Sequence, residues 1–154
     1  MTHPTQARPT SSERMREDFE TAFAALEEET SSSARPRLIA VDDDPAILDV
    51  IEVVGNEAGY EVLLLTEAGE LLDAVARFAP QVIISDLMMP NVDGVTLLRN
   101  LGAAGAKCSV IVASAADPKT LTAAVRLGRG YGLDMAPPMP KPFTATVLHE
   151  ALTR

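Results

Sequence analysis

The alternation of short apolar runs with helical patterns from Arg37 onward constrains the fold more than any other feature of the sequence. The runs are apolar throughout, which is typical of strands buried on both faces of a parallel sheet. They are RLIAV, EVLLL, QVIIS, CSVIVA and a weaker run around LDMAPPM. Helices are predicted at about 45–58, 67–78, 93–104, 118–128 and 144–153. We therefore predict a doubly wound α/β fold, in which five βα units form a five-stranded parallel sheet.

Two of the predicted helices begin with the same pair of residues. Asp44-Pro45 and Asp117-Pro118 each supply an N-cap side chain followed by proline at the first helical position. The carboxylates of Asp44 and Asp117 are therefore expected to cap helices.

The first 35 residues differ in composition from the rest, so we predict an N-terminal extension over 1–35 and a domain over 36–154. The extension is polar, and TSSSARP has the composition of a linker. Between its polar ends, one helix is predicted at about 12–29, where Thr10 and Glu13 have the spacing of a capping box. One apolar stripe runs along this helix: Met15, Phe19, Ala22, Phe23 and Leu26. The stripe favours a helix that docks on the domain, on a second copy as a homodimer or on another protein, and a frayed tail is the alternative.

Charge and composition exclude several classes of protein. The net charge of -9 argues against a nucleic-acid-binding surface, which needs clustered Lys and Arg. A single cysteine excludes an internal disulfide, and two histidines make a zinc site of His and Cys improbable. The sequence contains neither an apolar run of bilayer length nor the apolar segment of a signal peptide. We therefore expect a cytoplasmic protein with no membrane partner.

Polar side chains gather where the predicted strands end. Asp42, Asp43 and Asp44 follow the first run, and Ser85-Asp86 ends the third. Ser114 ends the fourth run, and Lys141 follows the fifth. Ligands of open α/β sheets bind beyond the carboxyl ends of the strands. Adjacent carboxylates suit Mg²⁺, while a hydroxyl and an ammonium suit phosphoryl oxygens, so the set fits phosphoryl transfer onto a carboxylate.

Four motifs in this order give the chain a resemblance to a known family. VDDDP, IISDLMMPNVDG, VASA and KPF resemble those of the receiver domain of two-component response regulators. The resemblance covers roughly residues 36–154 and implies a flavodoxin-like (βα)5 fold. It also implies a cis peptide bond between Lys141 and Pro142.

The resemblance assigns a role to each polar residue at the strand ends. Asp86 is implied to be the phosphoacceptor, with Ser114 as the switch hydroxyl and Lys141 as the contact to the phosphoryl group. Mg²⁺ is implied to bind four groups: Asp42, Asp43, Asp86 and the backbone carbonyl of Met88. A cation there would explain why like charges stand side by side in the sequence.

The sequence departs from the family pattern at several positions. Pro138 stands where receivers usually have an aromatic residue whose rotamer couples to the switch hydroxyl, and the switch residue is serine rather than threonine. The resemblance implies that Met88 and Ala116 flank the path of the water that hydrolyses an aspartyl phosphate. Neither side chain can hydrogen-bond that water, so we predict slow dephosphorylation.

We expect a stand-alone receiver that takes a phosphoryl group from a histidine kinase or a histidine phosphotransferase. It would then bind a downstream protein or drain phosphate from a relay, with no catalysis beyond its own phosphorylation and dephosphorylation. One alternative is a pseudo-receiver, a binding module that is never phosphorylated. Another is a phosphohydrolase of the haloacid dehalogenase type, but those enzymes have a second carboxylate at the position of Met88.

Overall fold

The computed structural model describes residues 10–32 and 34–154, with side chains described for 10–23 and 34–154. The chain divides into two compact units at the boundary between Ala34 and Arg35. The larger unit is an α/β domain, and the smaller unit contains one long helix. None of the helices in the described ranges has the length and apolar character that crossing a bilayer requires.

A parallel sheet forms the centre of the larger unit. Its first three strands in sequence are β1 (Arg37–Val41), β2 (Glu61–Leu65) and β3 (Val82–Ser85), and they are followed by β6 (Ser109–Ser114). The order across the sheet is β2-β1-β3-β6-β7, and every pairing in it is parallel. The strand order changes direction at β1, so the carboxyl ends of β1 and β3 border the crevice where ligands bind in such sheets.

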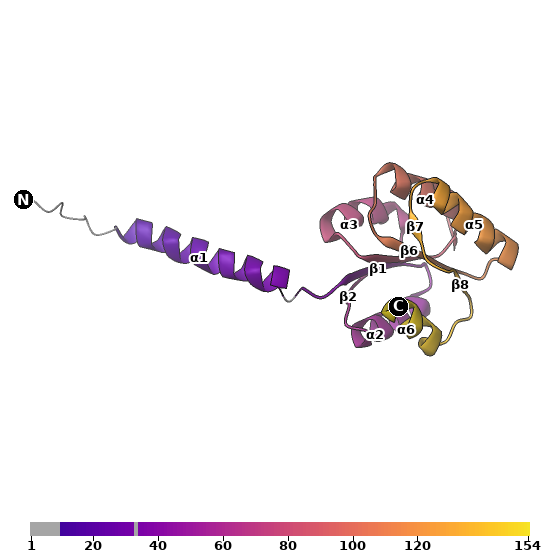
Figure 1. Cartoon of the computed structure of the whole chain (residues 1–154), viewed down its shortest axis with the longest axis horizontal. Coiled ribbons are helices and arrows are strands. Elements are labelled where there is room, and N and C mark those ends of the chain that lie inside the picture. Colours follow the sequence, from indigo (N-terminus) through magenta and orange to yellow (C-terminus); the bar gives the residue numbers. More distant parts are fainter. Residues whose placement is uncertain (1–9, 33) are drawn as a thin grey trace, which may run out of the picture. The chain divides into compact units, whose positions relative to one another are not determined.

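Helices cover both faces of this sheet (Figure 1). On one face lie α3 (Leu71–Phe78), α4 (Gly94–Ala103) and α5 (Pro118–Gly130), and on the other lie α2 (Pro45–Glu57) and α6 (Ala145–Thr153). Each helix layer packs on one side of the strands, which gives two apolar cores separated by the sheet. The doubly wound α/β fold class predicted from the alternating pattern is confirmed.

The helix starts agree with the expected capping chemistry. The Asp44 carboxylate accepts a hydrogen bond from the Ala46 N–H at 2.9 Å, and the Asp117 carboxylate accepts one from the Thr120 N–H at 2.8 Å. Both predicted caps are therefore confirmed. The helix expected at 67–78 begins instead as a 3₁₀ turn, η1 (Ala68–Glu70), and Glu67 makes no side-chain cap before it.

The fifth position of the sheet departs from a continuous strand. Two short segments, β7 (Asp134–Met135) and β8 (Met139–Pro140), both pair with β6. Between them lie Ala136, Pro137 and Pro138. Proline has no N–H to donate to a ladder, so the pair of prolines divides the edge strand into two pieces.

The N-terminal helix α1 spans Ser11–Ser32, slightly longer than the predicted range. Its capping box forms as expected: the Glu13 N–H donates to the Thr10 hydroxyl at 3.3 Å, and the Thr10 N–H donates to the Glu13 carboxylate at 2.8 Å. Phe19 and Phe23 stack with their ring centroids 6.2 Å apart. The side chain of Leu26, the last member of the predicted stripe, lies outside the described residues.

A pair of leucines on the same face of the sheet tests the importance of this core. Leu101 in α4 is fully buried, whereas Leu72 in α3 is exposed. We expect Leu101→Ala to lower the free energy of unfolding by about 2–5 kcal/mol, because it removes apolar contacts and leaves a cavity. Leu72→Ala should lower it by less than about 1 kcal/mol. Urea denaturation followed by circular dichroism measures both, and equal losses would contradict the assignment of the core.

Candidate phosphoacceptor site

The carboxyl ends of β1 and β3 hold two aspartates in place through their backbones. The Asp86 N–H donates to the Val41 carbonyl at 3.1 Å, which continues the β1–β3 ladder by one residue. The Asp42 N–H donates to the Leu65 carbonyl at 3.1 Å and continues the β1–β2 ladder in the same way. Because both N–H groups are bonded, the side chains of Asp42 and Asp86 project from fixed points at one edge of the sheet.

Lys141 reaches the same edge from the other side. Its N–H donates to the Ser114 carbonyl at 2.9 Å, directly after the β6–β8 pairing. The peptide bond between Lys141 and Pro142 is cis, as the family resemblance implied. The short segment β8, which comes directly before Lys141, therefore positions this residue, even though the edge strand is divided into two pieces.

The ammonium of Lys141 bridges the two aspartates. It donates to Asp42 Oδ2 at 2.6 Å and to Asp86 Oδ2 at 3.0 Å. Asp42 and Asp86 are 2% and 5% exposed, respectively. Two carboxylates buried side by side require a compensating cation, and the lysine supplies that charge.

The remaining carboxylate oxygens are also bonded. Asp42 Oδ1 accepts from the Asp44 N–H at 2.9 Å, and Asp86 Oδ1 accepts from the Met88 N–H at 3.0 Å. In each case the donor lies two positions after the aspartate that accepts, so the local turns orient both carboxylates. Asp44 thus serves the site through its backbone and the helix through its side chain.

Burial and ion pairing shift the ionisation of this cluster in opposite directions. Burial raises the pKa of Asp42, and the hydrogen bonds from Lys141 and Asp44 only partly offset it. Burial acts to lower the pKa of Lys141, but the hydrogen bonds to Asp42 and Asp86 and the charges of both aspartates outweigh it and raise that pKa. Lys141 is therefore held as the charged ammonium.

Asp43 joins the two buried aspartates to make a group of three carboxylates. Single oxygens from Asp42, Asp43 and Asp86 all lie within 4.8 Å of one another, and this is the only such acidic group found among the described residues. Asp43 itself is exposed. An all-oxygen donor set that is open to solvent on one side fits Mg²⁺, which binds through a few carboxylates and keeps several waters. The residues present therefore fit the expected ion.

Ser114 lies at the end of β6 and is fully buried. Its hydroxyl oxygen accepts a hydrogen bond from the Ala116 N–H at 3.2 Å. Its carbonyl holds the Lys141 backbone, so the two residues are tied together at this edge of the sheet. The structure thus brings all the predicted site residues to the carboxyl ends of neighbouring strands.

A short hairpin follows Asp86. It pairs β4 (Met88–Met89) with β5 (Val92–Asp93), and Asn91 at its turn has a φ of 65°. A Cβ built on Gly94, the residue after it, would lie 2.7 Å from the Leu87 Cα. Glycine is therefore required at this position for the backbone of α4 to approach the loop that carries Asp86.

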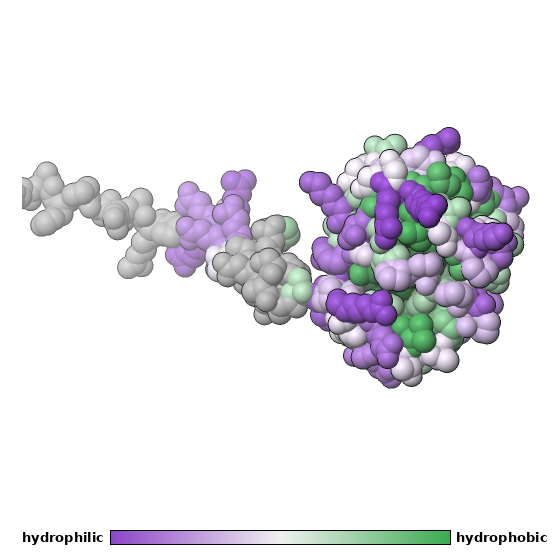
Figure 2. Space-filling view, turned by 45° about the vertical axis from the view of Figure 1, so that its right-hand side comes forward, coloured by the Kyte–Doolittle hydropathy of each residue, from purple (hydrophilic) through white to green (hydrophobic). Residues whose placement is uncertain are grey.

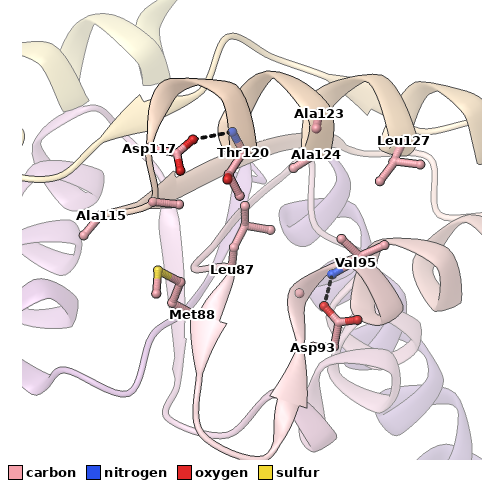
Figure 3. A pocket seen from close by; sticks show the side chains of 12 residues that line it. Leu87, Met88, Asp93, Val95, Ala115, Asp117, Thr120, Ala123, Ala124 and Leu127 are labelled. Carbon is pink, nitrogen blue, oxygen red and sulfur yellow. Dashed lines mark hydrogen bonds between the residues drawn. The ribbon is translucent and has the colours of Figure 1, made fainter.

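A groove of about 510 Å³ begins beside the site (Figure 3). Met88 and Ala115 lie at one end of it, and Ala123 and Leu127 of α5 lie toward the other. Met88 is 63% exposed. Apolar side chains thus occupy the surface next to the buried aspartates, as the sequence predicted for Met88.

Sequence reasoning gave Lys141 a contact to a phosphoryl group but missed its bond to Asp42. It also missed the backbone donors of Asp44 and Met88. The available signal was the charge balance: an acidic pair expected inside a sheet edge needs a cation, and Lys141 was the one lysine predicted there. The backbone donors follow from turn geometry that residue types alone do not specify.

Comparisons with known proteins identify the family of the chain. Residues 38–153 match the response regulator receiver domain family. The chain belongs to this family. It is 35% identical over 118 residues to the response regulator MprA of Mycobacterium leprae and 31% identical over 116 residues to the DNA-binding response regulator MtrA of Mycolicibacterium smegmatis. The matches cover 77% and 73% of this chain but 48% and 49% of those relatives, so the chain spans about half their length.

Solved structures support the fold assignment. The receiver domain of the Francisella response regulator 1452 superposes with a TM-score of 0.66 at 26% identity, covering 76% of this chain and 93% of that domain. The Vibrio cholerae chemotaxis protein CheY4 gives a TM-score of 0.67 at 24% identity, covering 79% of this chain and 98% of that protein. The second likeness shows the fold alone.

Removing the bridging ammonium tests the electrostatics of the site. Lys141→Met leaves two buried carboxylates without their cation, and we expect the free energy of unfolding at pH 7 to fall by about 3 kcal/mol. This is the lower end of the range for buried pairs, because Lys141 keeps some contact with solvent. Lys119→Met, a matched change at an exposed position of α5, should alter it by less than about 0.5 kcal/mol.

The stability loss of Lys141→Met should also depend on pH. Burial already raises the folded-state pKa of Asp42 above the unfolded value near 3.8, and without the hydrogen bond from Lys141 that pKa rises further. The folded variant then binds protons that the unfolded chain has released, so stability is gained as pH falls and lost as pH rises through the raised folded pKa. The deficit relative to the unsubstituted protein should therefore shrink between pH 7 and pH 5 in urea titrations. A deficit independent of pH would contradict an electrostatic origin.

Proposed function

We propose that this protein is a phosphoacceptor receiver, in which Asp86 takes a phosphoryl group from a phosphohistidine of a histidine kinase or a histidine phosphotransferase. The observation that carries the proposal is the bridged pair: Lys141 Nζ lies 3.0 Å from Asp86 and 2.6 Å from Asp42, beside a third carboxylate. Family membership makes this arrangement a candidate for aspartyl phosphorylation rather than a structural ion pair.

The chemistry that we propose uses Asp86 as the nucleophile. One carboxylate oxygen of Asp86 forms a bond to phosphorus while the bond from phosphorus to the donor breaks, and the donor leaves with the electron pair. The Met88 N–H and the Lys141 ammonium each donate a hydrogen bond to the carboxylate and orient it for attack. Lys141 then remains beside the transferred group and balances its added charge.

Two further parts complete the proposed site. Asp42, Asp43, Asp86 and the backbone carbonyl of Met88 would hold Mg²⁺, which supplies charge neutralisation for the phosphoryl oxygens when bound. The Ser114 hydroxyl would donate to a phosphoryl oxygen. It already lies at this edge of the sheet, where its oxygen accepts from the Ala116 N–H. Rotation of this hydroxyl group would couple the phosphorylated state to the loop after β6.

Phosphorylation would act through protein binding, in the cytoplasm, where kinases have access to ATP. The added charge would shift the equilibrium between two arrangements of the loops at the site. A partner that binds one arrangement more tightly would then distinguish the phosphorylated from the unphosphorylated protein. The protein would have no substrate beyond the phosphoryl group that it accepts and later loses. The conformational change would spread from the site in a different way than in most receivers. Pro138 stands where those proteins have an aromatic side chain that changes rotamer.

The pseudo-receiver remains the second candidate, and the exposed Met88 is the observation that favours it, since an apolar side chain two positions after Asp86 would hinder the approach of a phosphodonor. The two functions differ in one measurement: a pseudo-receiver gains no acyl phosphate from any donor. The dehalogenase-type phosphohydrolase would instead turn over small phosphate esters. Met88 gives that chemistry no acid or base at the position where it needs a carboxylate.

Phosphorylation by a small donor tests the proposal directly. In the presence of Mg²⁺ and acetyl phosphate, the protein should gain one hydroxylamine-sensitive phosphate, measured by intact-mass spectrometry. Asp86→Asn should abolish this gain, and chelating Mg²⁺ should suppress it. Asp49→Asn, the same change at an exposed position of α2, should leave it unchanged. Labelling of Asp86→Asn at the level of the unsubstituted protein would exclude the proposed phosphoacceptor.

The lifetime of the phosphorylated state tests the role of Met88. Its side chain is exposed beside Asp86 and offers no hydrogen bond to an attacking water. We expect Met88→Asn and Met88→Glu to speed the loss of phosphate by about tenfold or more, because a polar group there can orient the water. The purified phosphoprotein is freed of donor, and its decay in Mg²⁺ is followed by intact-mass spectrometry.

The control for this experiment is Met15→Asn, which makes the same chemical change at an exposed position of the other unit. It should leave the decay rate unchanged. Decay within seconds in the unsubstituted protein, with no effect of either Met88 substitution, would show that Met88 does not limit hydrolysis.

A further inference from the structure

Ser85 carries a buried hydroxyl that has no part in the chemistry proposed above. It is the last residue of β3, directly before Asp86, and it is 2% exposed. Its register partners on the neighbouring strands are Val41 and Val112, and both valines belong to the core that α3, α4 and α5 cover. A hydroxyl buried among apolar groups is destabilising unless it is hydrogen-bonded. The serine at this position therefore depends on the bond that its hydroxyl makes.

The partner of the Ser85 hydroxyl is the backbone of the phosphoacceptor itself. The hydroxyl donates to the Asp86 carbonyl at 3.2 Å. The Asp86 N–H donates in turn to the Val41 carbonyl. Each residue has only two soft backbone torsions, one on the side of its N–H and one on the side of its carbonyl. With both groups bonded, the backbone of Asp86 is restrained on both sides.

The peptide between Asp86 and Leu87 determines where Met88 lies. The Met88 N–H donates to Asp86 Oδ1 at 3.0 Å, which closes a turn between an aspartate side chain and the backbone two residues later. Such a turn closes only while the peptides within it keep their orientation. The Ser85 hydroxyl holds the first of these peptides. It therefore supports the orientation of the Asp86 carboxylate and the position of the Met88 backbone together.

Packing against α4 restrains the same segment in a different way. A Cβ built on Gly94 would lie 2.7 Å from the Leu87 Cα and 2.8 Å from the Leu87 carbonyl oxygen, so Leu87 and α4 are in close contact. This contact limits how far the segment can move toward the helix. A hydrogen bond, unlike an apolar contact, also depends on direction and so restrains the rotation of a peptide. Ser85 therefore contributes a restraint that the contact with α4 does not supply.

We propose that Ser85 is a positioning residue for the phosphoacceptor loop, defined as residues 86–88. Its hydroxyl holds the Asp86 peptide, so that the Asp86 carboxylate keeps its bond to the Met88 N–H and the Met88 carbonyl keeps a fixed direction. Because that carbonyl is one of the proposed ligands of Mg²⁺, the proposal deepens the proposed function and rests on it for the effects on Mg²⁺ and phosphorylation. The effect on the Met88 turn depends on neither.

Hydrogen exchange at the Met88 amide tests the proposal without metal or phosphate. Ser85→Ala removes the hydroxyl with little change in volume. In this variant the Met88 amide proton should exchange about three- to tenfold faster, as expected for the loss of one net hydrogen bond. The Gln81 amide, which donates to the Arg37 carbonyl just before β3, should change by less than about twofold. Both rates are measured by NMR on the full chain at one pH.

A matched pair of variants separates the hydroxyl from side-chain volume. Ser85→Thr keeps the hydroxyl, whereas Ser85→Val has nearly the same shape without it. Ser85→Thr should keep the slow exchange at Met88, and Ser85→Val should show the fast exchange of Ser85→Ala. Ser109→Ala makes the same change as Ser85→Ala at the first residue of β6, at the opposite edge of the sheet, and should leave exchange at Met88 unchanged.

Two further measurements extend the test to the proposed chemistry. In calorimetric titrations, the Mg²⁺ dissociation constant should be about three- to tenfold higher for Ser85→Ala and Ser85→Val than for Ser85→Thr and the unsubstituted protein. At saturating Mg²⁺, the maximal rate of phosphorylation by acetyl phosphate should fall by a similar factor, because a less oriented carboxylate attacks less often. An unsubstituted protein that gains no phosphate would contradict the proposed function, whereas the exchange at Met88 still decides the role of Ser85.

Four outcomes would overturn the proposal. Unchanged exchange at Met88 in Ser85→Ala would show that the hydroxyl does not hold the loop. Equally fast exchange in Ser85→Thr and Ser85→Val would assign the effect to side-chain volume. An equal acceleration at Gln81 would assign it to the stability of the whole domain. A Mg²⁺ dissociation constant that is the same in all variants would overturn the role of Ser85 at the cation site.

Discussion

The ammonium of Lys141, held between the carboxylates of Asp42 and Asp86, is the interaction on which the site depends. Both aspartates are almost fully buried, and their charges would repel without a cation between them. The arrangement is possible because β1, β3 and β8 end at one edge of the sheet, where a backbone hydrogen bond fixes each of the three residues. The sheet thus holds a compact arrangement of opposite charges at the place where it also exposes a third carboxylate.

This arrangement links the electrostatics of the resting protein to its proposed chemistry. A phosphoryl group on Asp86 would bring added negative charge to a position where an ammonium already stands. Mg²⁺ at the acidic group would add further positive charge, so the balance between Asp42, Asp86 and Lys141 would change with each step. Because one ammonium compensates two buried carboxylates, adding one or two charges would change the contacts among these three side chains. Such a response is what a switch requires.

The two units of the chain contribute different physical properties. The α/β unit buries its apolar residues in two cores and holds its polar site at one edge of the sheet, and hydrophilic and hydrophobic residues are intermixed on the face that Figure 2 shows. Helix α1 does the opposite, with stacked aromatic rings on its surface. The charged site and the exposed apolar stripe of α1 thus lie on separate units of the chain.

The order of strands and helices, and which polar residues meet at the strand ends, could be predicted from the sequence, because they depend on local patterns. Continuous apolar runs specify buried strands, aspartate before proline specifies a capped helix, and strand ends specify where polar residues meet. Asp44 and Asp117 as caps, and the meeting of Asp42, Asp86 and Lys141 at one edge, followed from such patterns. The capping box of Thr10 and Glu13 did so as well.

Only the tertiary structure decided how these groups contact one another. The bond from Lys141 to Asp42 joins residues 99 positions apart, and the division of the edge strand at Pro137 and Pro138 depends on pairing with β6. The Met88 and Asp44 N–H donors depend on the turns that the strands impose. Residue types in the sequence determined which charges and apolar faces this protein has, whereas distances between remote residues arise only when the sheet forms, because packing and not local preference sets them.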